Sequence, residues 1–490
     1  MHLQRVQVPD FRVLKDVDIT FEHDFNPRVF PLGSQNGGGK STLLQLIFIL
    51  LHCSTNSERL PALKNLLSGF NLYKGDNKRI LAIIDIWDGE KTVQLEFFIC
   101  GDAYLHQLLN LNDVNYDTDD NKNLNLFNFY SFFTLEDINQ QISQFQQEEE
   151  ELKGIIEQFS YRHSDTTPSG KFPDALKNRL LKVGIKFDSI GAEFSDPDSL
   201  GKIDKEAKRQ LLNRHNAIKN QKVIFLDAID KLIQLMQSSD IKYITYQLYK
   251  SEDPEPNLIP LLCHVKNLRI DNADQFLDEL SNKIFLAAPS TQIFLFLSKN
   301  SRRSLFAAKN SYQSDLIQMN SILTGLFTYD FFATDILIDS FKRAGEHDFM
   351  EKLQTGKYGN NYDALSNDLE FLLHNKQVHL TPDFSSLTFT KEESNRIVEL
   401  NSEDFSHGEL KRLSIYIWLK YKNIEGAIVL MDEVDLALHP DWQYQIPTDL
   451  VEWEPSNQYI LATHSYELCQ ALTPSHVKVL EPKLTERRSE

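Results

Sequence analysis

The sequence has few cysteines, no long apolar run and a shortage of positive charge. Its cysteines have no paired spacing, which excludes a disulfide framework and a zinc site and suits a reducing cytoplasm. The longest apolar stretch, residues 43–53, is too short for the roughly 18–20 residues of a membrane helix, and the N-terminus lacks a signal-peptide core. We therefore expect a cytoplasmic protein that makes no membrane contact. The cysteines are Cys53, Cys100, Cys263 and Cys469.

The charge balance is acidic, with 51 lysines and arginines against 70 aspartates and glutamates and a net charge of −19. Such a protein is repelled by DNA unless a local basic patch overrides the net charge. One segment carries such a cluster: Lys202, Lys205, Lys208, Arg209, Arg214, Lys219 and Lys222. It is either a solvated helix face or a surface for nucleic acid or a partner protein, so DNA stays open as a partner. Arg302 and Arg303 form a second, weaker candidate.

The hydrophobic pattern predicts an α/β protein in three parts. Residues 1–100 form an N-terminal lobe of strands with one helix at 41–51, residues 101–280 a mainly helical insertion, and residues 281–490 a C-terminal lobe. Within the insertion we expect charged helices at 135–160 and 202–238 around a Ser/Pro-rich linker at 162–200. These helices hold no clean heptad, so a long coiled-coil arm is not expected. Strand signals in the last part lie at 284–297, 378–390 and 428–431.

A glycine-rich turn between a strand and an apolar helix carries the first chemical signal. Glycines let backbone N–H groups turn onto phosphates, and the helix N-terminus adds its positive end. Lys40 would reach the β- and γ-phosphates and Ser41 would ligate Mg²⁺. Ser34 departs from the strict pattern, which has glycine at this position. The alternative to a phosphate-binding loop is a glycine-rich loop that binds no ligand. The predicted nucleotide-binding residues are Gly33, Asn36, Gly37, Gly38, Gly39, Lys40, Ser41 and Thr42.

A second signal is the apolar stretch 428–431 followed by Asp432 and Glu433. An apolar strand of this kind belongs in a covered parallel sheet, whose carboxyl edge binds ligands. Asp432 would hold the metal shell, and Glu433 would act as general base toward the attacking water. The pattern is weak alone, because residues 223–227 imitate it with Ala228 in place of the second carboxylate; we interpret that segment as a buried helix or strand.

The neighbouring motifs strengthen the second signal. Residues 406–409, Ser-His-Gly-Glu, open an apolar helix, Asp435 follows the two carboxylates, and His464 ends another apolar strand. Taken alone, Ser406 with Glu409 is also a helix capping box, and His464 could be a satisfied histidine at a strand end.

In this order the motifs resemble those of the ABC ATPase superfamily: Walker A, signature loop, Walker B, D-loop and switch histidine. The resemblance implies an α/β P-loop head, with a mixed sheet and helices on both of its faces, that the mainly helical insertion splits. The resemblance implies catalytic roles for Lys40, Glu433 and His464 and nucleotide contacts from Asp435 and the signature loop. It also implies ATP and Mg²⁺ as cofactors, and a head-to-tail dimer or higher homo-oligomer in which each signature loop closes over the partner's ATP. His407 departs from the usual glycine. The residues of the signature loop are Ser406, His407, Gly408 and Glu409. The predicted metal ligands are Ser41, Asp432 and Gln292, and Gln292 is the candidate for the Q-loop glutamine.

The two halves of the predicted site lie far apart in the chain, whereas transporter ATPases keep them close. This split resembles SMC and RecF-like ATPases and their relatives in bacterial antiviral systems. The sequence ends soon after His464, so we expect neither a TOPRIM domain nor nuclease activity of its own. The layout is most similar to the PtuA family of Septu and retron systems, which acts with an HNH nuclease. The second most similar layout is that of the AriA family of PARIS, which holds a TOPRIM effector. The alternatives are a DNA-maintenance ATPase and an ATP-dependent scaffold with slow hydrolysis.

Overall fold

The computed structural model describes most of the chain. The described residues are 1–35, 37–101, 104, 135–162, 205–220, 222–223, 226, 240–249, 257–269, 272–304, 312–329, 334–373, 376–393, 396–401 and 404–480. The chain divides into two compact units, the first comprising Met1–Gly101, Asp240–Gln247 and Pro260–Glu490, the second Asp102–Ser239 and Leu248–Ile259. The predicted insertion at 101–280 differs from this division, because segments within 240–280 belong to the first unit.

A parallel six-stranded sheet forms the centre of the first unit. Its order is β15-β3-β14-β13-β8-β9, and every pairing in it is parallel. Each residue of β13 and β14 is buried, as expected for a sheet covered on both faces. The strands are β3 (Val29–Gly33), β8 (Ile284–Ala288), β9 (Leu326–Thr328), β13 (Ile428–Asp432), β14 (Gln458–Thr463) and β15 (Lys478–Val479). The predicted α/β fold is confirmed.

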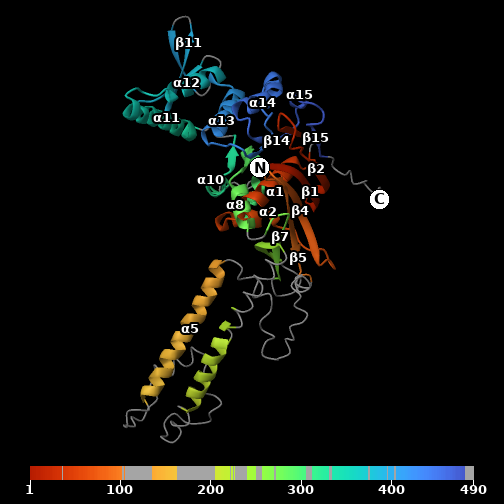
Figure 1. Ribbon diagram of the computed structural model, residues 1–490, viewed down its shortest axis with the longest axis vertical. Coiled ribbons are helices and arrows are strands. Elements are labelled where there is room, and N and C mark those ends of the chain that lie inside the picture. The colour runs from red at the N-terminus through yellow and green to blue at the C-terminus, as the bar shows by residue number, and fades with distance from the viewer. Residues whose placement is uncertain are drawn as a thin grey trace. The chain divides into compact units, whose positions relative to one another are not determined.

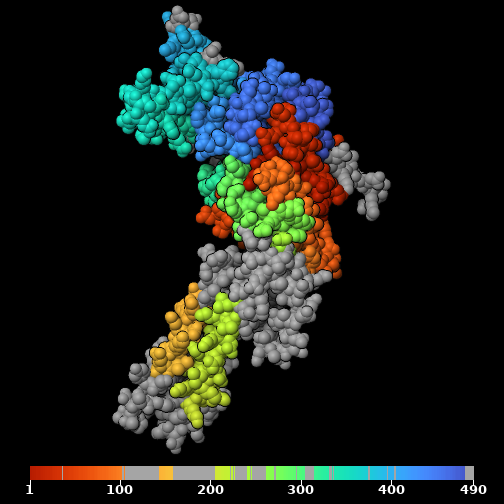
Figure 2. All heavy atoms as spheres, in the orientation of Figure 1, coloured from red at the N-terminus to blue at the C-terminus, as the bar shows by residue number. Residues whose placement is uncertain are grey.

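The strand register brings the two ends of the chain to one edge of this sheet. Gly33 of β3 pairs with Thr463 of β14, and Asp432 of β13 pairs with Ala462. Because parallel strands share their direction, the residues that follow all three strands emerge together. Figure 2 shows N-terminal atoms (red) packed against C-terminal atoms (blue) in this unit.

An antiparallel sheet of order β2-β1-β4-β5-β7-β6 completes the first lobe. The Gln458 side chain joins the two sheets through buried hydrogen bonds with the Leu3 backbone, 2.8 Å from Leu3 N and 2.9 Å from Leu3 O. Sequence analysis missed that β6 and β7 extend this sheet. The strands are β1 (His2–Phe11), β2 (Leu14–Thr20), β4 (Lys78–Trp87), β5 (Thr92–Cys100), β6 (Ile241–Tyr249) and β7 (Asn257–Lys266).

Helix α1 packs against strands of the parallel sheet, whereas α11 and α12 lie apart from that sheet (Figure 1). Helix α1, where a helix was predicted at 41–51, is buried along almost its whole length. No helix in the described residues is both long and apolar enough to cross a membrane. The helices are α1 (Lys40–Cys53), α2 (Leu60–Leu67), α8 (Ala273–Ser281), α9 (Lys299–Ser304), α10 (Tyr312–Ile322), α11 (Thr334–Thr355), α12 (Asn361–Leu372), α13 (His407–Tyr421), α14 (Pro440–Trp453) and α15 (Tyr466–Gln470).

A small antiparallel sheet, β10 (Lys376–Leu380), β11 (Leu387–Glu393) and β12 (Arg396–Leu400), follows α12. Two strand predictions in this half were too long. The predicted strand 378–390 is two strands, with a turn closed by the bond from Thr381 N to Ser386 O. The predicted strand 284–297 ends at Ala288, and Pro289 caps a short 3₁₀ helix, Ser290–Gln292.

The second unit contains a pair of packed helices, α5 (Leu135–Arg162) and residues 205–220, drawn side by side in orange and yellow-green (Figure 1). The Glu149 carboxylate of α5 lies 3.9 Å from His215 and 3.7 Å from Lys222. Val223 and Leu226 are exposed and helical, so the interpretation of residues 223–227 as a buried element was wrong for these two positions. The buried residues of the pair are Leu152, Ile155, Ala207, Leu211 and Ile218.

Candidate functional site

The glycine-rich loop has the backbone that only glycine adopts readily. Gly37 and Gly39 have φ angles of 80° and 91°, and Gly39 is the N-cap of α1. A Cβ on Gly38 would lie 2.4 Å from the Ser34 hydroxyl. The loop therefore turns its backbone tightly over the start of α1, as a phosphate cradle requires. Asn36 lies outside the described residues; Thr42 is half-buried in the first turn of α1.

Ser34, the departure from the strict glycine pattern, fits because its side chain has a partner. The Lys40 ammonium lies 3.1 Å from the Ser34 hydroxyl and 3.5 Å from its carbonyl oxygen, and the hydroxyl donates to Gln35 O. The serine therefore helps to hold Lys40 across the loop.

Lys40 also reaches the other end of the chain. Its ammonium lies 2.8 Å from Nε2 of His464, the first residue after β14. Lys40 is only 6% exposed, so burial lowers its pKa, while the carboxylates of Asp432, Asp435 and Glu433 act in the opposite direction. The charge of the buried Lys40 ammonium is therefore stabilised by three carboxylates at the end of β13 and in the turn that follows it.

Asp432, at the end of β13, is buried without a hydrogen-bond partner for either carboxylate oxygen. Burial raises its pKa to about 6, and the nearby Ser41 hydroxyl offsets only part of this rise. Orphaned carboxylate oxygens are rare in folded proteins, and a cation is one explanation for them. Asp432 and Ser41 therefore fit Mg²⁺, which uses one or two protein oxygens together with substrate phosphates. The described residues hold no cluster of three or more His, Cys, Asp or Glu side chains suited to a metal.

Glu433 has a φ of 49°, in the left-handed region that non-glycine residues rarely occupy. Strained backbone of this kind tends to occur at functional sites. The Gln292 amide donates to its carboxylate at 3.3 Å, and the Gln45 amide of α1 donates to the Gln292 carbonyl at 2.6 Å. Gln292, predicted from sequence as a metal ligand, is thus held beside the predicted general base by the helix that begins at Lys40.

The turn after Glu433 is held by side chains from two helices. The Gln443 amide of α14 donates to the carbonyls of Asp435 and Leu438 at 3.2 and 2.9 Å. One carboxylate oxygen of Asp435, Oδ1, is buried without a partner.

The signature residues open helix α13. Ser406 accepts from the Glu409 amide at 3.2 Å, and the Glu409 carboxylate accepts from the Ser406 amide at 2.9 Å, so the capping box expected from sequence is present. Ser406 and His407 are exposed, whereas Gly408 is buried. The hydrogen bonds of Ser406 go to Glu409 and not to the phosphate-binding loop. Ser406 and His407 thus lie on the surface, and among the described residues Ser406 has no hydrogen bond with Lys40.

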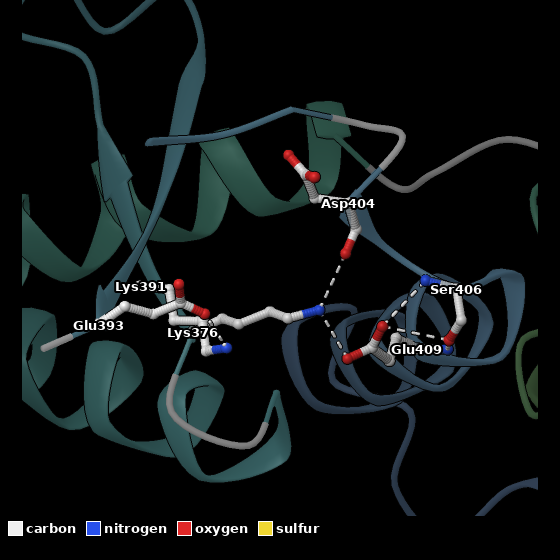
Figure 3. Close-up of polar contacts among 6 residues, drawn as sticks. All are labelled: Lys376, Lys391, Glu393, Asp404, Ser406 and Glu409. Carbon is white, nitrogen blue, oxygen red and sulfur yellow. Dashed lines mark hydrogen bonds and ion pairs between the residues drawn. The ribbon is translucent and has the colours of Figure 1, made fainter. Parts of the chain in front are cut away.

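A lysine outside the motifs fixes this capping box (Figure 3). The Lys376 ammonium of β10 contacts the Glu409 carboxylate at 2.8 Å and the Asp404 carbonyl at 3.2 Å, above the ring of Phe405. Burial would raise the pKa of Glu409, but Lys376 and the Ser406 amide hold it below its usual value. The roles of Lys376 and Gln45 could not be predicted from neighbouring residues. Glu409, the partner of Lys376, lies 33 positions away in the sequence.

Comparison with known proteins gives a family match over part of the chain. Residues 250–470 match the family described as "AAA domain, putative AbiEii toxin, Type IV TA system". Parts of the chain are similar to two proteins described as probable ATPases of retrons. It is 43% identical over 54 residues to "Retron Vc95 probable ATPase" of Vibrio cholerae serotype O1 biovar El Tor, 11% of this chain and 10% of the relative. It is 25% identical over 138 residues to "Retron Ec83 probable ATPase" of Escherichia coli, 25% of this chain and 26% of the relative. The chain thus spans at most about a quarter of the length of these relatives.

Among solved structures, the chain is similar to the Smc head domain of Pyrococcus furiosus with an extended coiled coil and bound ScpA C-terminal domain. That match has a TM-score of 0.31 at 11% identity and covers 96% of this chain and 91% of the other. The match to the Smc head domain of Pyrococcus yayanosii has a TM-score of 0.30 at 10% identity and covers 96% of this chain and 93% of the other. Similarity this low carries no argument about function.

Proposed function

We propose that this chain is an ATPase of the ABC type that dimerises around ATP and controls a separate nuclease effector in antiviral defence. The AAA-domain match implies ATP binding, and the relatives support an ATPase linked to retron-type defence. Magnesium, the dimer and the effector are further parts of the proposal, and each has its own test below.

One observation carries the ATPase part. Lys40 touches His464, and Gln292 touches Glu433, although the four residues follow four different strands. All of them lie at the carboxyl edge of the parallel sheet, where open α/β folds bind nucleotides. A cation donor, a buried carboxylate and a strained glutamate at that edge have the composition of a phosphate-transfer site.

In the proposed reaction, the loop amides and Lys40 bind the β- and γ-phosphates. Bound Mg²⁺, held by Ser41 and Asp432, would supply charge neutralisation on the phosphate oxygens. Glu433 accepts a proton from the attacking water as the water oxygen bonds to the γ-phosphorus and the bond from that phosphorus to the ADP oxygen breaks. Gln292 orients the Glu433 carboxylate through its 3.3 Å hydrogen bond. His464 leaves Lys40 when phosphate arrives and contacts the γ-phosphate.

The exposed signature residues support a dimer. Ser406 and His407 present the N-terminus of a fifteen-residue helix to solvent, and such a terminus favours an anion. In a head-to-tail dimer that anion is the γ-phosphate bound by the partner's loop. Asp435, with one unpartnered oxygen, would then lie at the same interface. Ser406→Arg should abolish ATP-induced dimerisation while leaving ATP binding intact.

Phosphate release from ATP and Mg²⁺ tests the catalytic part. Glu433→Gln should keep ATP binding, lower the hydrolysis rate about 10²-fold or more, and accumulate ATP-bound dimers in light scattering. Chelation of Mg²⁺ should stop hydrolysis. A wild-type protein that releases no phosphate, or a Glu433→Gln variant as active as wild type, would contradict the proposal.

Co-expression with the neighbouring reading frames tests the effector part. An HNH or TOPRIM protein should co-purify with the chain, and loss of either gene should remove protection against phage. Purified chain alone should leave DNA uncut. Protection that survives deletion of every neighbouring nuclease frame would exclude an effector of this kind.

DNA contact is a second candidate function, favoured by the exposed Lys205, Arg214 and Lys219 on the helix 205–220. Part of the cluster is already neutralised, since Arg209 pairs with Glu206 at 2.7 Å. Replacing the three exposed residues by glutamine should flatten the dependence of DNA binding on salt concentration. An unchanged slope of DNA affinity against salt concentration would contradict DNA binding by this helix.

A further inference from the structure

Lys411 connects the signature helix to the turn that carries Glu433. It lies one turn into α13 and is 7% exposed. Its ammonium donates to the Glu433 carbonyl at 2.7 Å and to the Leu436 carbonyl at 3.0 Å, and it lies 4.3 Å from the centre of the Tyr329 ring. A buried ammonium needs such acceptors, because burial of an uncompensated charge costs several kcal/mol.

The turn that Lys411 holds is strained at both ends. Glu433 and Ala437 have φ angles of 49° and 67°, and non-glycine residues at such angles cost on the order of 1–3 kcal/mol each. Strain of this kind persists only where surrounding contacts fix the backbone. Lys411 supplies two of those contacts, at the carbonyls of Glu433 and Leu436.

The first turn of α13 also meets this turn directly. A Cβ added to Gly408 would lie 2.9 Å from the Ala437 carbonyl oxygen and 3.1 Å from the Trp442 ring. The signature helix therefore lies against the turn at three carbonyls, those of Glu433, Leu436 and Ala437. A displacement of one element requires a displacement of the other.

Tyr329, which follows β9, covers the same cation. Its hydroxyl is buried without a hydrogen-bond partner, and burial together with Asp432 and the other carboxylates raises its pKa well above the usual value. The Tyr329 hydroxyl therefore stays neutral, and the ring shields the Lys411 ammonium from water. Low local polarity strengthens the lysine–carbonyl bonds.

We propose that Lys411 is a positioning residue that orients Glu433 for hydrolysis and couples that orientation to the signature helix. The proposal rests on the ATPase function proposed above. When the signature residues of α13 contact ATP on a second copy, the helix carries Lys411 and the Glu433 turn with it. Hydrolysis at one site therefore depends on closure over the other. Lys411 is buried and its ammonium donates to backbone carbonyls of the Glu433 turn, so its loss should lower the hydrolysis rate and leave ATP affinity unchanged.

Steady-state hydrolysis and equilibrium ATP binding of Lys411→Met test the proposal. The turnover number should fall at least about tenfold, because misplacement of a catalytic group by an ångström has effects of this size or larger. The dissociation constant for ATP should stay within about threefold of wild type. Lys411→Arg, which keeps the cation, should recover part of the turnover, whereas a residue that only supports the fold would show no separation of turnover from binding.

Lys420→Met is the matched control, since Lys420 lies on the same helix and is exposed. It should leave both quantities unchanged. If Lys411→Met does not fold, Lys411→Gln takes its place, because the amide keeps one donor for the two carbonyls. Wild-type turnover in Lys411→Met or Lys411→Gln, with an active wild-type protein, would overturn the role of Lys411 alone; an inactive wild-type protein would overturn the proposed function as well.

Discussion

The ammonium of Lys40 lies 2.8 Å from Nε2 of His464, although 424 positions separate the two residues in sequence. A lysine ammonium only donates hydrogen bonds, so Nε2 of His464 accepts and the ring carries its proton on Nδ1. Triphosphate oxygens would compete for the same ammonium. This contact explains how ATP could release His464 from one partner and offer it another.

His464→Ala tests that exchange. The variant should bind ATP with nearly wild-type affinity, because the loop and Lys40 remain, and should hydrolyse it about 10²-fold more slowly, the effect of removing one donor to a developing charge. Equilibrium binding and phosphate release measure the two effects. His379→Ala, at an exposed position of β10, is the control and should change neither. Unaltered hydrolysis in His464→Ala would exclude a role for the histidine.

Asp432→Asn tests whether the buried carboxylate of Asp432 destabilises the fold when it is ionised. The folded-state pKa of about 6 lies above the ordinary 3.8, so the folded state binds more protons than the unfolded state between these values. The contribution of Asp432 to stability therefore falls as pH rises through this range, by about 3 kcal/mol in total. Without ATP and Mg²⁺, Asp432→Asn should be more stable than wild type above pH 6 and similar to it near pH 4.

Denaturant unfolding at several pH values measures this difference. The same variant should lose magnesium-dependent hydrolysis, so that greater stability accompanies lost activity. A stability difference that does not vary between pH 4 and pH 7 would show that Asp432 is not a buried anion in the absence of ligand.

Gly408→Ala should destabilise the fold by about 1–3 kcal/mol, because the added methyl meets the Ala437 carbonyl and the Trp442 ring, and backbone cannot yield as a flexible side chain can. Gly345→Ala is a matched control. Gly345 lies within α11 with no atom within 4 Å of an added Cβ, so alanine there should stabilise by about 0.5–1 kcal/mol. Equal effects at both positions, measured by thermal unfolding, would contradict the close packing of α13 on the turn.

Lys376→Met should destabilise the start of α13. The Lys376 and Glu409 side chains are 13% and 15% exposed, so loss of the cation leaves a mostly buried carboxylate, at a cost of about 1–3 kcal/mol. Lys391→Met is the control in the same sheet (Figure 3), since Lys391 and its partner Glu393 are 38% and 60% exposed and should contribute less than about 1 kcal/mol. Equal losses in the two variants would show that Lys376 does not fix the capping box.

Sequence could predict those features of the site that follow a local rule. Glycines at positive φ near Lys40, apolar residues before Asp432, and a serine three residues before Glu409 each have a local physical cause. The order of these motifs then placed distant segments on one sheet. The predicted strand boundaries were less accurate where strands end in short turns, as after Ala288.

The remaining contacts depend on partners far apart in sequence. Lys376, Lys411 and Tyr329 look like ordinary surface or core residues until the fold brings them to Glu409 and the Glu433 turn. Strands β6 and β7 were missed because their neighbours are polar and charged, and only pairing with β5 identifies β7 as part of the first sheet. Their role is a property of the tertiary structure.

Equilibrium binding of ATP to wild type and Lys40→Ala tests the central claim, that both ends of the chain build one nucleotide site. Wild type should bind ATP, and Lys40→Ala should bind it at least about tenfold more weakly, the effect of losing charge-assisted bonds to phosphate. Lys74→Ala, at an exposed position, should bind as wild type does. Equal affinity of wild type and Lys40→Ala for ATP, or no binding by wild type, would contradict the account.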